Sequence, residues 1–437
     1  MKKVTVFLIC LLIGLQVFAN GSSEKDSNQK EREILFTTMN YGDVNSWQAM
    51  WQKMADQFYA ETNIKVKHEI INWAQAREKI TTWHVGGDAP DVIDMFWSKT
   101  YSELGAGKFG TRPIEEYIDK YIPDYYEKFQ KSAISDVENF GHIYGIPWRI
   151  DVRPMVYRKD FLEQAGIDPN SIVTWDDLLE AGKKLTITDS DGKITRYGVG
   201  FLYTDAPQQL YTWLWQAGGA FMNDTYDKAT IDTPAAKEAL EMLYRMVNID
   251  HIASGDLYKD PSYDPIADFV AGNAAIVPSA PTDIKTFIER NAPQLKDVVV
   301  AREPLKNKTQ DAFQGAGYFT PTYQCDDMDA AMQWLAFISR PENMLEMSKV
   351  SNTLTPCVPA LQDPYFNENW WFSGQIKALP YGRTTQHPNT AWGAITNRQP
   401  GSPIYDMMVS VMNDESSIDD ALKTCQKRMT DLIEEVK

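Results

Sequence analysis

The sequence predicts an α/β fold in two lobes, and three features of the chain lead to that prediction. At 437 residues, the chain is longer than one hydrophobic core normally fills, so we expect two domains. Between residues 33 and 96, short strands alternate with helices, which is typical of a parallel sheet covered by helices. Residues 142–161 (HIYGIPWRIDVRPMVYRKDF), near the middle, read as a strand that crosses between the lobes.

The first lobe is expected to begin with strands at 33–38, 64–71 and 92–96, separated by two helices. The first of these helices carries Trp47, Met50, Trp51, Met54 and Phe58 at helical spacing, which favours a core role. In such sheets ligands bind beyond the carboxyl ends of the strands. One crevice is therefore expected to collect the residues that follow the first and third strands, namely Asn40, Tyr41, Asp43, Trp97, Ser98 and Lys99.

The central segment has the residue pattern of a strand with one apolar and one charged face. Gly145-Ile146-Pro147 prevents a helix from continuing into it. From there the apolar residues Trp148, Ile150, Val152 and, past Pro154, Val156 alternate with Arg149, Asp151 and Arg153. Such a strand suits a crossing between two lobes at a ligand site. An ordinary amphipathic strand with a solvated charged face is the alternative.

The second half of the chain continues the alternation of helices and strands. Thr174 and Asp177 predict a capping box at the start of a helix over 175–184. Asp189–Gly192 is similar to a calcium loop but lacks the bidentate Glu, so Asp191-Gly192 is expected to form a hairpin turn. Further strands are expected at 197–203 and 274–277, and further helices at 208–217 and 235–247. The helix at 208–217 carries Tyr211, Trp213 and Trp215, of which at least one is expected to be exposed to a ligand.

Composition and the chain ends limit the possible functions. A net charge of −17 argues against non-specific binding to nucleic acid or to anionic lipid. Residues 1–19 read as a cleaved signal peptide and 20–32 as a disordered linker, which predicts a soluble periplasmic or extracellular protein. Cys325 and Cys357 are the nearest pair for a disulfide. We find no metal motif, and the G-x-G-x-x-G match at 105–110 has no strand immediately before it, so no cofactor is expected.

Several segments, in this order and spacing, resemble the extracellular solute-binding proteins of sugar ABC transporters, the maltose-type binding proteins. The resemblance covers essentially the whole chain after residue 19. It rests on FYAETNIKVK (58–67), GGDAPDVIDMF (86–96), YGIPWRIDVRPMVYRKDFLEQAGID (144–168), TWDDLLEAGKKL (174–185), QAGGAF (216–221), IDTPAAKEALEML (231–243), GNAAIVPSAP (272–281), GYFTPT (317–322), AAMQWLAFISRPENM (330–344) and SSIDDALKTCQKRMTDLI (416–433).

The resemblance implies a type II periplasmic-binding fold, with two lobes joined by crossing hinge strands. It implies one lobe of residues 33–148 plus 317–352 and another of 149–316 plus 353–437. It also implies a monomer that binds a sugar in the inter-lobe cleft and delivers it to the permease subunits of an ABC importer. The binding residues carried over by motif are Asn40, Tyr41, Asp43, Asp94, Trp97, Trp148, Arg149, Asp151, Tyr211, Trp215 and Trp392. Many relatives have Trp where this chain has Thr282, so one stacking platform is missing.

The residue types agree with a sugar ligand. Aromatic rings cover the apolar C–H faces of a sugar, while Asp, Asn and Arg hydrogen-bond its hydroxyls. The chain has no HExxH, G-x-S-x-G or P-loop motif, so we expect a binding protein rather than an enzyme. Two alternatives remain. One is the same fold binding a non-sugar solute, such as a polyol or a glycerophosphodiester. The other is a secreted carbohydrate-active enzyme with paired carboxylates.

Overall fold

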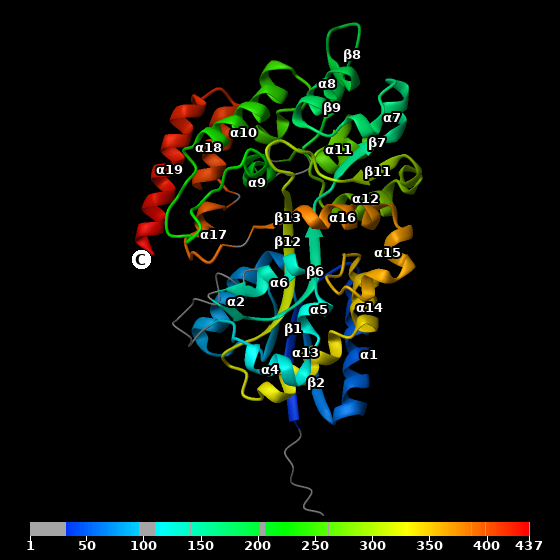
Figure 1. Cartoon of the computed structure of the whole chain (residues 1–437), viewed down its shortest axis with the longest axis vertical. Coiled ribbons are helices and arrows are strands. Elements are labelled where there is room, and N and C mark those ends of the chain that lie inside the picture. The colour runs from blue at the N-terminus through cyan, green and yellow to red at the C-terminus, as the bar shows by residue number, and fades with distance from the viewer. Residues whose placement is uncertain are drawn as a thin grey trace, which may run out of the picture.

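Two lobes, each built on its own β-sheet, make up the part of the chain that the computed structural model describes (Figure 1). The described residues are 32–95, 110–139, 141–201, 206–260, 262–385, 387–397 and 399–436. The predicted signal peptide, the linker up to residue 31, Trp97 and most of the G-x-G-x-x-G match lie outside these ranges. Both lobes combine helices with a sheet, so the α/β prediction is confirmed.

The first lobe contains a six-stranded sheet in the order β13-β12-β3-β1-β2, with β6 paired to β12. Strands β1 to β3 are parallel, and β12 runs antiparallel to β3 and β6. The elements of this lobe are β1 (Arg32–Met39), α1 (Val44–Thr62), β2 (Ile64–Ile71), α2 (Trp73–Gly86), β3 (Val92–Met95), α4 (Glu115–Tyr121), α5 (Tyr125–Lys128), α6 (Lys131–Val137), β4 (Glu138–Asn139), β5 (His142–Ile143), β6 (Ile146–Val152), β12 (Ala312–Pro321), α13 (Met328–Ile338) and α14 (Pro341–Ser351). The predicted first three strands are therefore confirmed.

The second lobe contains a five-stranded sheet in the order β11-β7-β10-β9-β8. The capping box predicted at Thr174 and Asp177 is present, and β8 and β9 form the hairpin predicted around Asp189–Gly192. The elements of this lobe are β7 (Met155–Arg158), α7 (Lys159–Gln164), α8 (Trp175–Leu185), β8 (Ile187–Thr188), β9 (Ile194–Val199), α9 (Ala206–Gln216), α10 (Pro234–Tyr244), α11 (Pro265–Ala271), β10 (Ala274–Val277), α12 (Asp283–Asn291) and β11 (Val299–Arg302).

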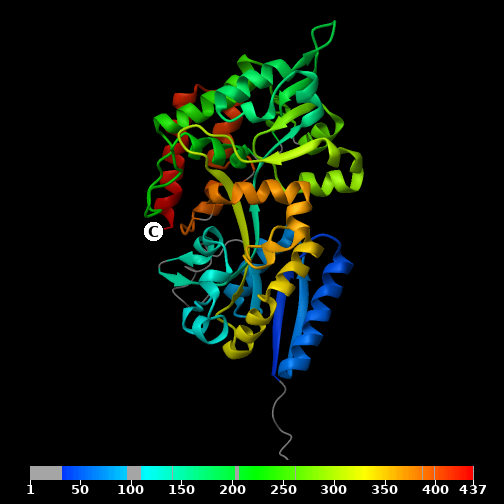
Figure 2. The same cartoon turned by 45° about the vertical axis from the view of Figure 1, so that its right-hand side comes forward.

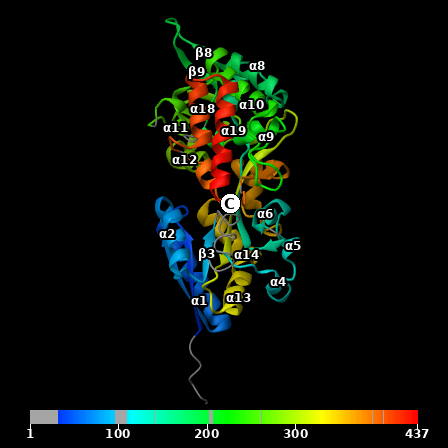
Figure 3. The ribbon, with the colours of Figure 1, turned by 90° about the vertical axis from the view of Figure 1, so that its left-hand side faces the viewer.

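The C-terminal part of the chain adds helices to both the second lobe and the junction. Helices α18 and α19 lie along the outside of the second lobe, where their apolar residues join its core cluster (Figure 3). Helix α16 packs near β11, and β13 pairs with the beginning of β12. The elements are α15 (Pro364–Glu368), α16 (Trp370–Ala378), β13 (Gly382–Thr384), α17 (Trp392–Ile395), α18 (Pro403–Met412) and α19 (Ile418–Glu435).

The predicted central strand is two strands, which corrects its extent. It breaks at Arg153-Pro154, so that β6 pairs with β12 and β7 enters the second sheet. Proline explains the break, because it has no N–H to continue a ladder of hydrogen bonds. β6 and β12 run side by side between the lobes (Figure 2). Phe313 on β12 belongs to the core cluster of the second lobe, whereas Phe319 belongs to that of the first.

A third segment lies beside this strand pair. Leu354 forms an isolated bridge with Ile150 of β6, so the chain after α14 runs along the crossing strand. The exact boundaries of the two lobes stay a prediction.

Buried apolar side chains form a core cluster in each lobe and a third cluster around the junction. The predicted core stripe of α1 is confirmed, since Trp47, Trp51 and their apolar neighbours on that helix are buried. Cys325, Cys357 and Cys425 are buried and free, so Cys325 and Cys357, the nearest pair, do not form a disulfide. Burial raises the pKa of the Cys325 and Cys425 thiols to about 12, which leaves them unreactive. None of the helices within the described ranges is long and apolar enough to cross a membrane.

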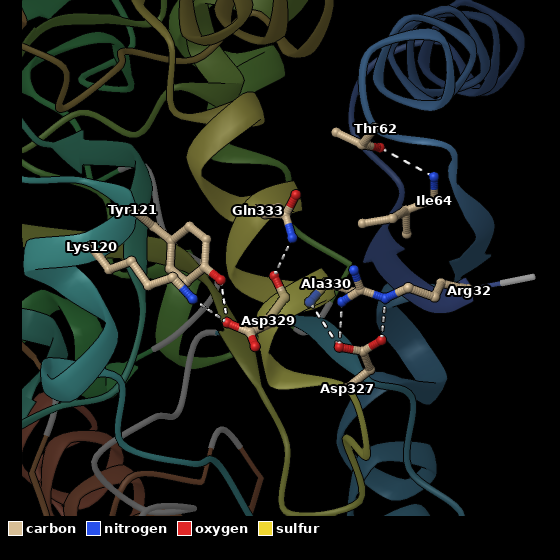
Figure 4. A network of polar contacts seen from close by, with 9 residues as sticks. All are labelled: Arg32, Thr62, Ile64, Lys120, Tyr121, Asp327, Asp329, Ala330 and Gln333. Carbon is tan, nitrogen blue, oxygen red and sulfur yellow. Dashed lines mark hydrogen bonds and ion pairs between the residues drawn. The ribbon is translucent and has the colours of Figure 1, made fainter. Parts of the chain in front are cut away.

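Surface ion pairs connect the start of β1 and helix α4 to helix α13 (Figure 4). The Arg32 guanidinium donates to both carboxylate oxygens of Asp327, the N-cap residue of α13. Asp329, on the same helix, accepts hydrogen bonds from Lys120 and Tyr121 of α4. Exposed ion pairs of this kind typically stabilise a protein by less than about 1 kcal/mol each. These pairs connect α13 to β1 and α4 at the surface of the first lobe.

Candidate functional site

One face of the β6–β12 strand pair carries the charged residues of the central segment. Residues directly opposite in an antiparallel pair point to the same face. Arg149 lies opposite Gly317, and Asp151 opposite Gly315. We call this surface the hinge face. Its residues are Arg149 and Asp151 of β6, Arg153 directly after β6, and Phe313, Gly315 and Gly317 of β12. The alternate residues of β6, Ile150 and Val152, pack into the junction cluster. The sequence prediction of one charged and one apolar face is confirmed.

At the first-lobe end of the hinge face, an aromatic group surrounds a buried carboxylate. The Trp148 indole Nε1 donates to Asp94 Oδ1 (2.9 Å), and its ring stacks on Phe319 at 9° between planes. The Tyr41 ring meets Trp148 edge to face at 4.9 Å between centroids. The Arg149 guanidinium lies over the Tyr41 ring at 5.1 Å. β1, β3 and β6 thus bring four predicted site residues together: Tyr41, Asp94, Trp148 and Arg149.

The carboxyl group of Asp94 has a raised pKa. It lies on β3, and its side chain is almost completely buried. Burial raises its pKa to about 6, against the hydrogen bond from Trp148 and the nearby charge of Arg149, which both lower it. Asp94 therefore titrates close to neutral pH.

Trp73 was missed by the sequence reasoning, which read it only as the start of a helix. It lies two residues after the end of β2, so it is at the same sheet edge as Asn40 and Tyr41. Its indole Nε1 donates to the backbone oxygen of Asn40 (2.9 Å), and its ring meets Tyr41 edge to face at 5.5 Å. Among the large apolar side chains of this group it is exposed, with 40% of its surface accessible. An aromatic residue just past the second strand was the signal that could have identified it.

At the second-lobe end, Phe313 connects the hinge face to a buried aromatic cluster. The Tyr211 ring contacts Trp215 (5.2 Å), Phe313 (5.8 Å) and Trp392 (6.2 Å between centroids). The three predicted site residues Tyr211, Trp215 and Trp392 are thus brought together. All are buried, and so is Trp213, although at least one residue of that helix was expected to be exposed.

Trp392, which the resemblance implied as a binding residue, is packed in the core of the second lobe. It begins the short helix α17 and is only 6% exposed. Its Nε1 donates to the backbone oxygen of Thr385 (3.0 Å), and its ring packs on Phe221 and His387. These partners come from distant parts of the chain, so local sequence pattern could not reveal the packing.

Asp151 lies between the two aromatic groups, in the middle of the hinge face. Its Oδ1 accepts a hydrogen bond from the Thr282 hydroxyl (2.7 Å), and its Oδ2 lies 3.9 Å from Arg153 Nε. Thr282 is the position at which the family resemblance implied that a stacking platform is missing. In this chain the position supplies a hydrogen-bond donor to a predicted binding residue in place of a stacking ring.

Comparison with known proteins gives the family of the chain. Residues 41–345, more than half of it, match the family model described as bacterial extracellular solute-binding protein.

The chain belongs to this solute-binding protein family.

Two solved structures share the fold of this solute-binding protein. The sugar-binding protein of Xanthomonas citri superposes with a TM-score of 0.79 at 17% identity, covering 92% of this chain and 98% of that one. The substrate-binding protein of a Listeria monocytogenes ABC transporter, in complex with cycloalternan, gives 0.74 at 20% identity, covering 92% and 99%. The predicted two-lobed fold is therefore confirmed.

Sequence relatives of the solute-binding protein include arabinooligosaccharide-binding proteins. The one from Halalkalibacterium halodurans is 26% identical over 269 residues, 60% of this chain and 57% of the relative. The one from Bacillus subtilis is 24% identical, over 57% of this chain and 55% of the relative. The chain thus spans somewhat more than half the length of these relatives.

Of the remaining predicted residues, Asp43 caps a helix and Asn40 lies beside Trp73. The Asp43 carboxylate is exposed and caps α1, accepting from the backbone N and hydroxyl of Ser46. These hydrogen bonds lower its pKa. The side-chain oxygen of Asn40 is buried and accepts no hydrogen bond from the residues that the structure describes. Trp97 lies outside those residues. Within them, no cluster of His, Cys, Asp and Glu could hold a metal ion.

Proposed function

We propose that this solute-binding protein captures a short oligosaccharide at the hinge face and delivers it to the permease of an ABC importer. The observation that carries the proposal is the row Arg149–Asp151–Arg153, which runs between an aromatic group of the first lobe and one of the second. Hydroxyl groups of a sugar would meet the charged row, and its apolar faces would meet the rings.

The dimensions of the hinge face favour more than one sugar ring. Arg149 lies on β6, and Arg153 directly follows that strand, four residues further along. Extended chain rises roughly 3.3 Å per residue, so the two residues lie about 13 Å apart. Arg149 contacts Tyr41 of the first lobe, and Arg153 lies over Phe313, which contacts Tyr211 of the second. A ligand that reached both aromatic groups would need the length of a short oligosaccharide.

The relatives support the same class of ligand and an exported location. The arabinooligosaccharide-binding proteins are named for an oligosaccharide. A protein of Streptomyces coelicolor, 32% identical over 28% of this chain, is named for diacetylchitobiose. Because the family consists of extracellular binding proteins, we infer that the chain works outside the cytoplasm, as a monomer, and releases its ligand chemically unchanged.

One feature favours a second candidate, a phosphate-bearing solute such as a glycerophosphodiester. Arg149 and Arg153 place two guanidinium groups on the hinge face, and Arg binds phosphate through paired hydrogen bonds. Arg153 is already engaged by Gln208 (2.6 Å) and by the Phe313 ring, which reduces its capacity for a phosphate. The sugar proposal therefore stands first.

A thermal-shift screen tests the two candidates directly. The panel contains arabino-, malto- and chito-oligosaccharides of two to six units, the matching monosaccharides, polyols and glycerophosphodiesters. A ligand that binds the folded state raises the melting temperature in proportion to its affinity and concentration. We expect the largest shift with an oligosaccharide, and recovery of that sugar intact after incubation. A shift with glycerophosphodiesters alone would contradict the sugar proposal, and release of shorter sugars would contradict pure binding.

Trp73→Ala is expected to weaken oligosaccharide binding about thirtyfold, on the order of 2 kcal/mol, with little change in ligand-free melting. The reason is that Trp73 is exposed beside Tyr41, where its ring is accessible for stacking. Isothermal titration with the sugar found in the screen measures the effect. Tyr59→Ala is the matched control, since Tyr59 is 39% exposed on α1 but is not among the residues at this sheet edge. Equal affinities for both variants would remove Trp73 from the site.

A further inference from the structure

Helix α12 contacts the hinge face at its beginning. Thr282 is its N-cap residue, and a Thr at this position usually accepts a hydrogen bond from a backbone N–H of the first helical turn. Here the side chain makes no such bond. Its hydroxyl donates instead to Asp151 Oδ1 (2.7 Å). The Thr282 hydroxyl thus hydrogen-bonds a hinge-face residue and does not cap its own helix.

The surrounding hydrogen bonds fix the direction of this contact. The amide Nε2 of Gln375, a fully buried residue of α16, donates to the Val152 backbone oxygen (3.0 Å) and to Thr282 Oγ1 (3.3 Å). A hydroxyl has a single proton to donate. Because Thr282 accepts from Gln375 and donates to Asp151, Asp151 must accept, as a carboxylate does. The orientation of Asp151 is therefore set by α12 and α16.

One turn further along, α12 contacts the first lobe through a buried lysine. The Lys285 side chain is 1% exposed, and its ammonium donates to Glu289 Oε2 (3.0 Å) and to the side-chain oxygen of Asn352. It also lies 4.8 Å from the centroid of the Phe372 ring. Burial lowers the pKa of Lys285, while Glu289 raises it. A buried ammonium is costly unless it is paired, so these contacts are required to keep it charged.

Asn352 lies at the end of α14, between the first lobe and the junction. It ends α14 with φ of 60°, in the left-handed region, and its amide donates back to Thr286 Oγ1 (3.4 Å) and Glu289 Oε2 (3.3 Å). Two residues later, the Leu354 backbone oxygen accepts from the Ile150 N–H of β6 (2.9 Å). Side chains of α12 in the second lobe therefore hydrogen-bond Asn352, the residue that links α14 of the first lobe to the segment paired with β6.

We propose that α12 couples the hinge face to the relative position of the two lobes, with Thr282 as a positioning residue for Asp151 and Lys285 as the group that holds Asn352. A solute that displaces Asp151 acts on the start of α12 through Thr282, and the helix transmits the displacement to Asn352. The contact of Asp151 with a solute rests on the proposed function. The link between α12 and the lobes does not depend on the proposed function. A proposed path requires measured coupling, so the coupling is measured on the protein without ligand.

Asn352→Gly removes the side chain that α12 holds and keeps the backbone conformation, since Gly adopts positive φ freely. Asn63→Gly is the matched control, because Asn63 ends α1 with φ of 59° and is exposed at the far end of that helix. Spin labels at Ala60→Cys on α1 and Thr424→Cys on α19, both exposed, report the distance between lobes. The native cysteines of the described chain are buried. We expect a shifted or broader distance distribution for Asn352→Gly and an unchanged one for Asn63→Gly. Superimposable distributions would overturn the proposal.

Thr282→Val and Thr282→Ser test the other end of the helix with the same labels. Valine keeps the shape of threonine without its hydroxyl, whereas serine keeps the hydroxyl. If α12 transmits displacement, Thr282→Val should change the lobe distances in the same sense as Asn352→Gly, and Thr282→Ser should resemble the parent protein. A change in Asn352→Gly alone would overturn the coupling and leave only a local contact. If Asn352→Gly fails to fold, the valine and serine pair decides the proposal.

Discussion

Trp392→Ala is expected to lower the free energy of unfolding of the ligand-free protein by about 3–5 kcal/mol, the usual cost of truncating a core tryptophan. The indole is almost fully buried between Tyr211, Phe221 and His387, and its N–H is hydrogen-bonded to Thr385. Removal leaves a cavity in the second-lobe cluster and an unpaired backbone oxygen. Urea denaturation followed by circular dichroism measures the loss.

The same variant separates a core role from a binding role. Trp73→Ala serves as the comparison, because Trp73 is an exposed indole whose removal should reduce affinity more than stability. If Trp392→Ala keeps its ligand-free stability and loses oligosaccharide binding, the ring acts as a stacking platform and the core assignment is wrong. A large loss of stability with normal affinity in the folded fraction would remove Trp392 from the proposed site.

Asp94 is expected to make the stability of the protein fall as the pH rises from about 4 to about 6. Its pKa in the folded protein is raised to about 6 by burial, whereas an unfolded Asp titrates near 3.9. Between those values the folded state binds more protons than the unfolded state, so the free energy of unfolding decreases with rising pH. A shift of this size corresponds to a change on the order of 3 kcal/mol at most.

Asp94→Asn should abolish this component, since the amide does not titrate and its oxygen can still accept from Trp148. Urea denaturation of both proteins at several values between pH 4 and pH 7 provides the slopes to compare. Asp43→Asn is a control of opposite sign, because the folded-state pKa of Asp43 is lowered by Ser46 and its stabilising effect is lost on acidification. Identical slopes for Asp94→Asn and the parent would show that Asp94 does not titrate in this range.

The elements of the fold could be predicted wherever local pattern and turn residues agreed. β2 and β10 were predicted with their observed bounds, because Asn63 precedes one and Pro278 follows the other. The central strand was predicted too long, since its alternation continues past Pro154 although the hydrogen-bond ladder does not. Alternation reports which face a side chain occupies, and it does not report which sheet the backbone joins.

The candidate site was predictable in part, and the limits are physical. The family motifs implied that Tyr41, Asp94, Trp148 and Arg149 share one site. They meet because Tyr41 follows β1, Asp94 lies on the neighbouring β3, and β6, which carries the other two, is joined to β3 through β12. Burial of the aromatic groups was not predictable, because it depends on partners such as Phe221 and Phe313 that lie far apart in the chain. Thr282 looked like the loss of a platform, and only the structure shows its hydroxyl bound to Asp151.

β12 lies far along the chain from β3, the strand that it pairs with, and this separation affects how the chain folds. The sheet of the first lobe joins β3, which ends at Met95, to β12, which starts at Ala312. Most of the second lobe must therefore be made before the first sheet can be completed. Contacts so distant in sequence slow folding, because a long loop must close before they stabilise the chain. Until then β3 presents an unpaired edge, which is prone to pair with other chains. Protein truncated before residue 312 is thus expected to aggregate rather than to yield an isolated first lobe.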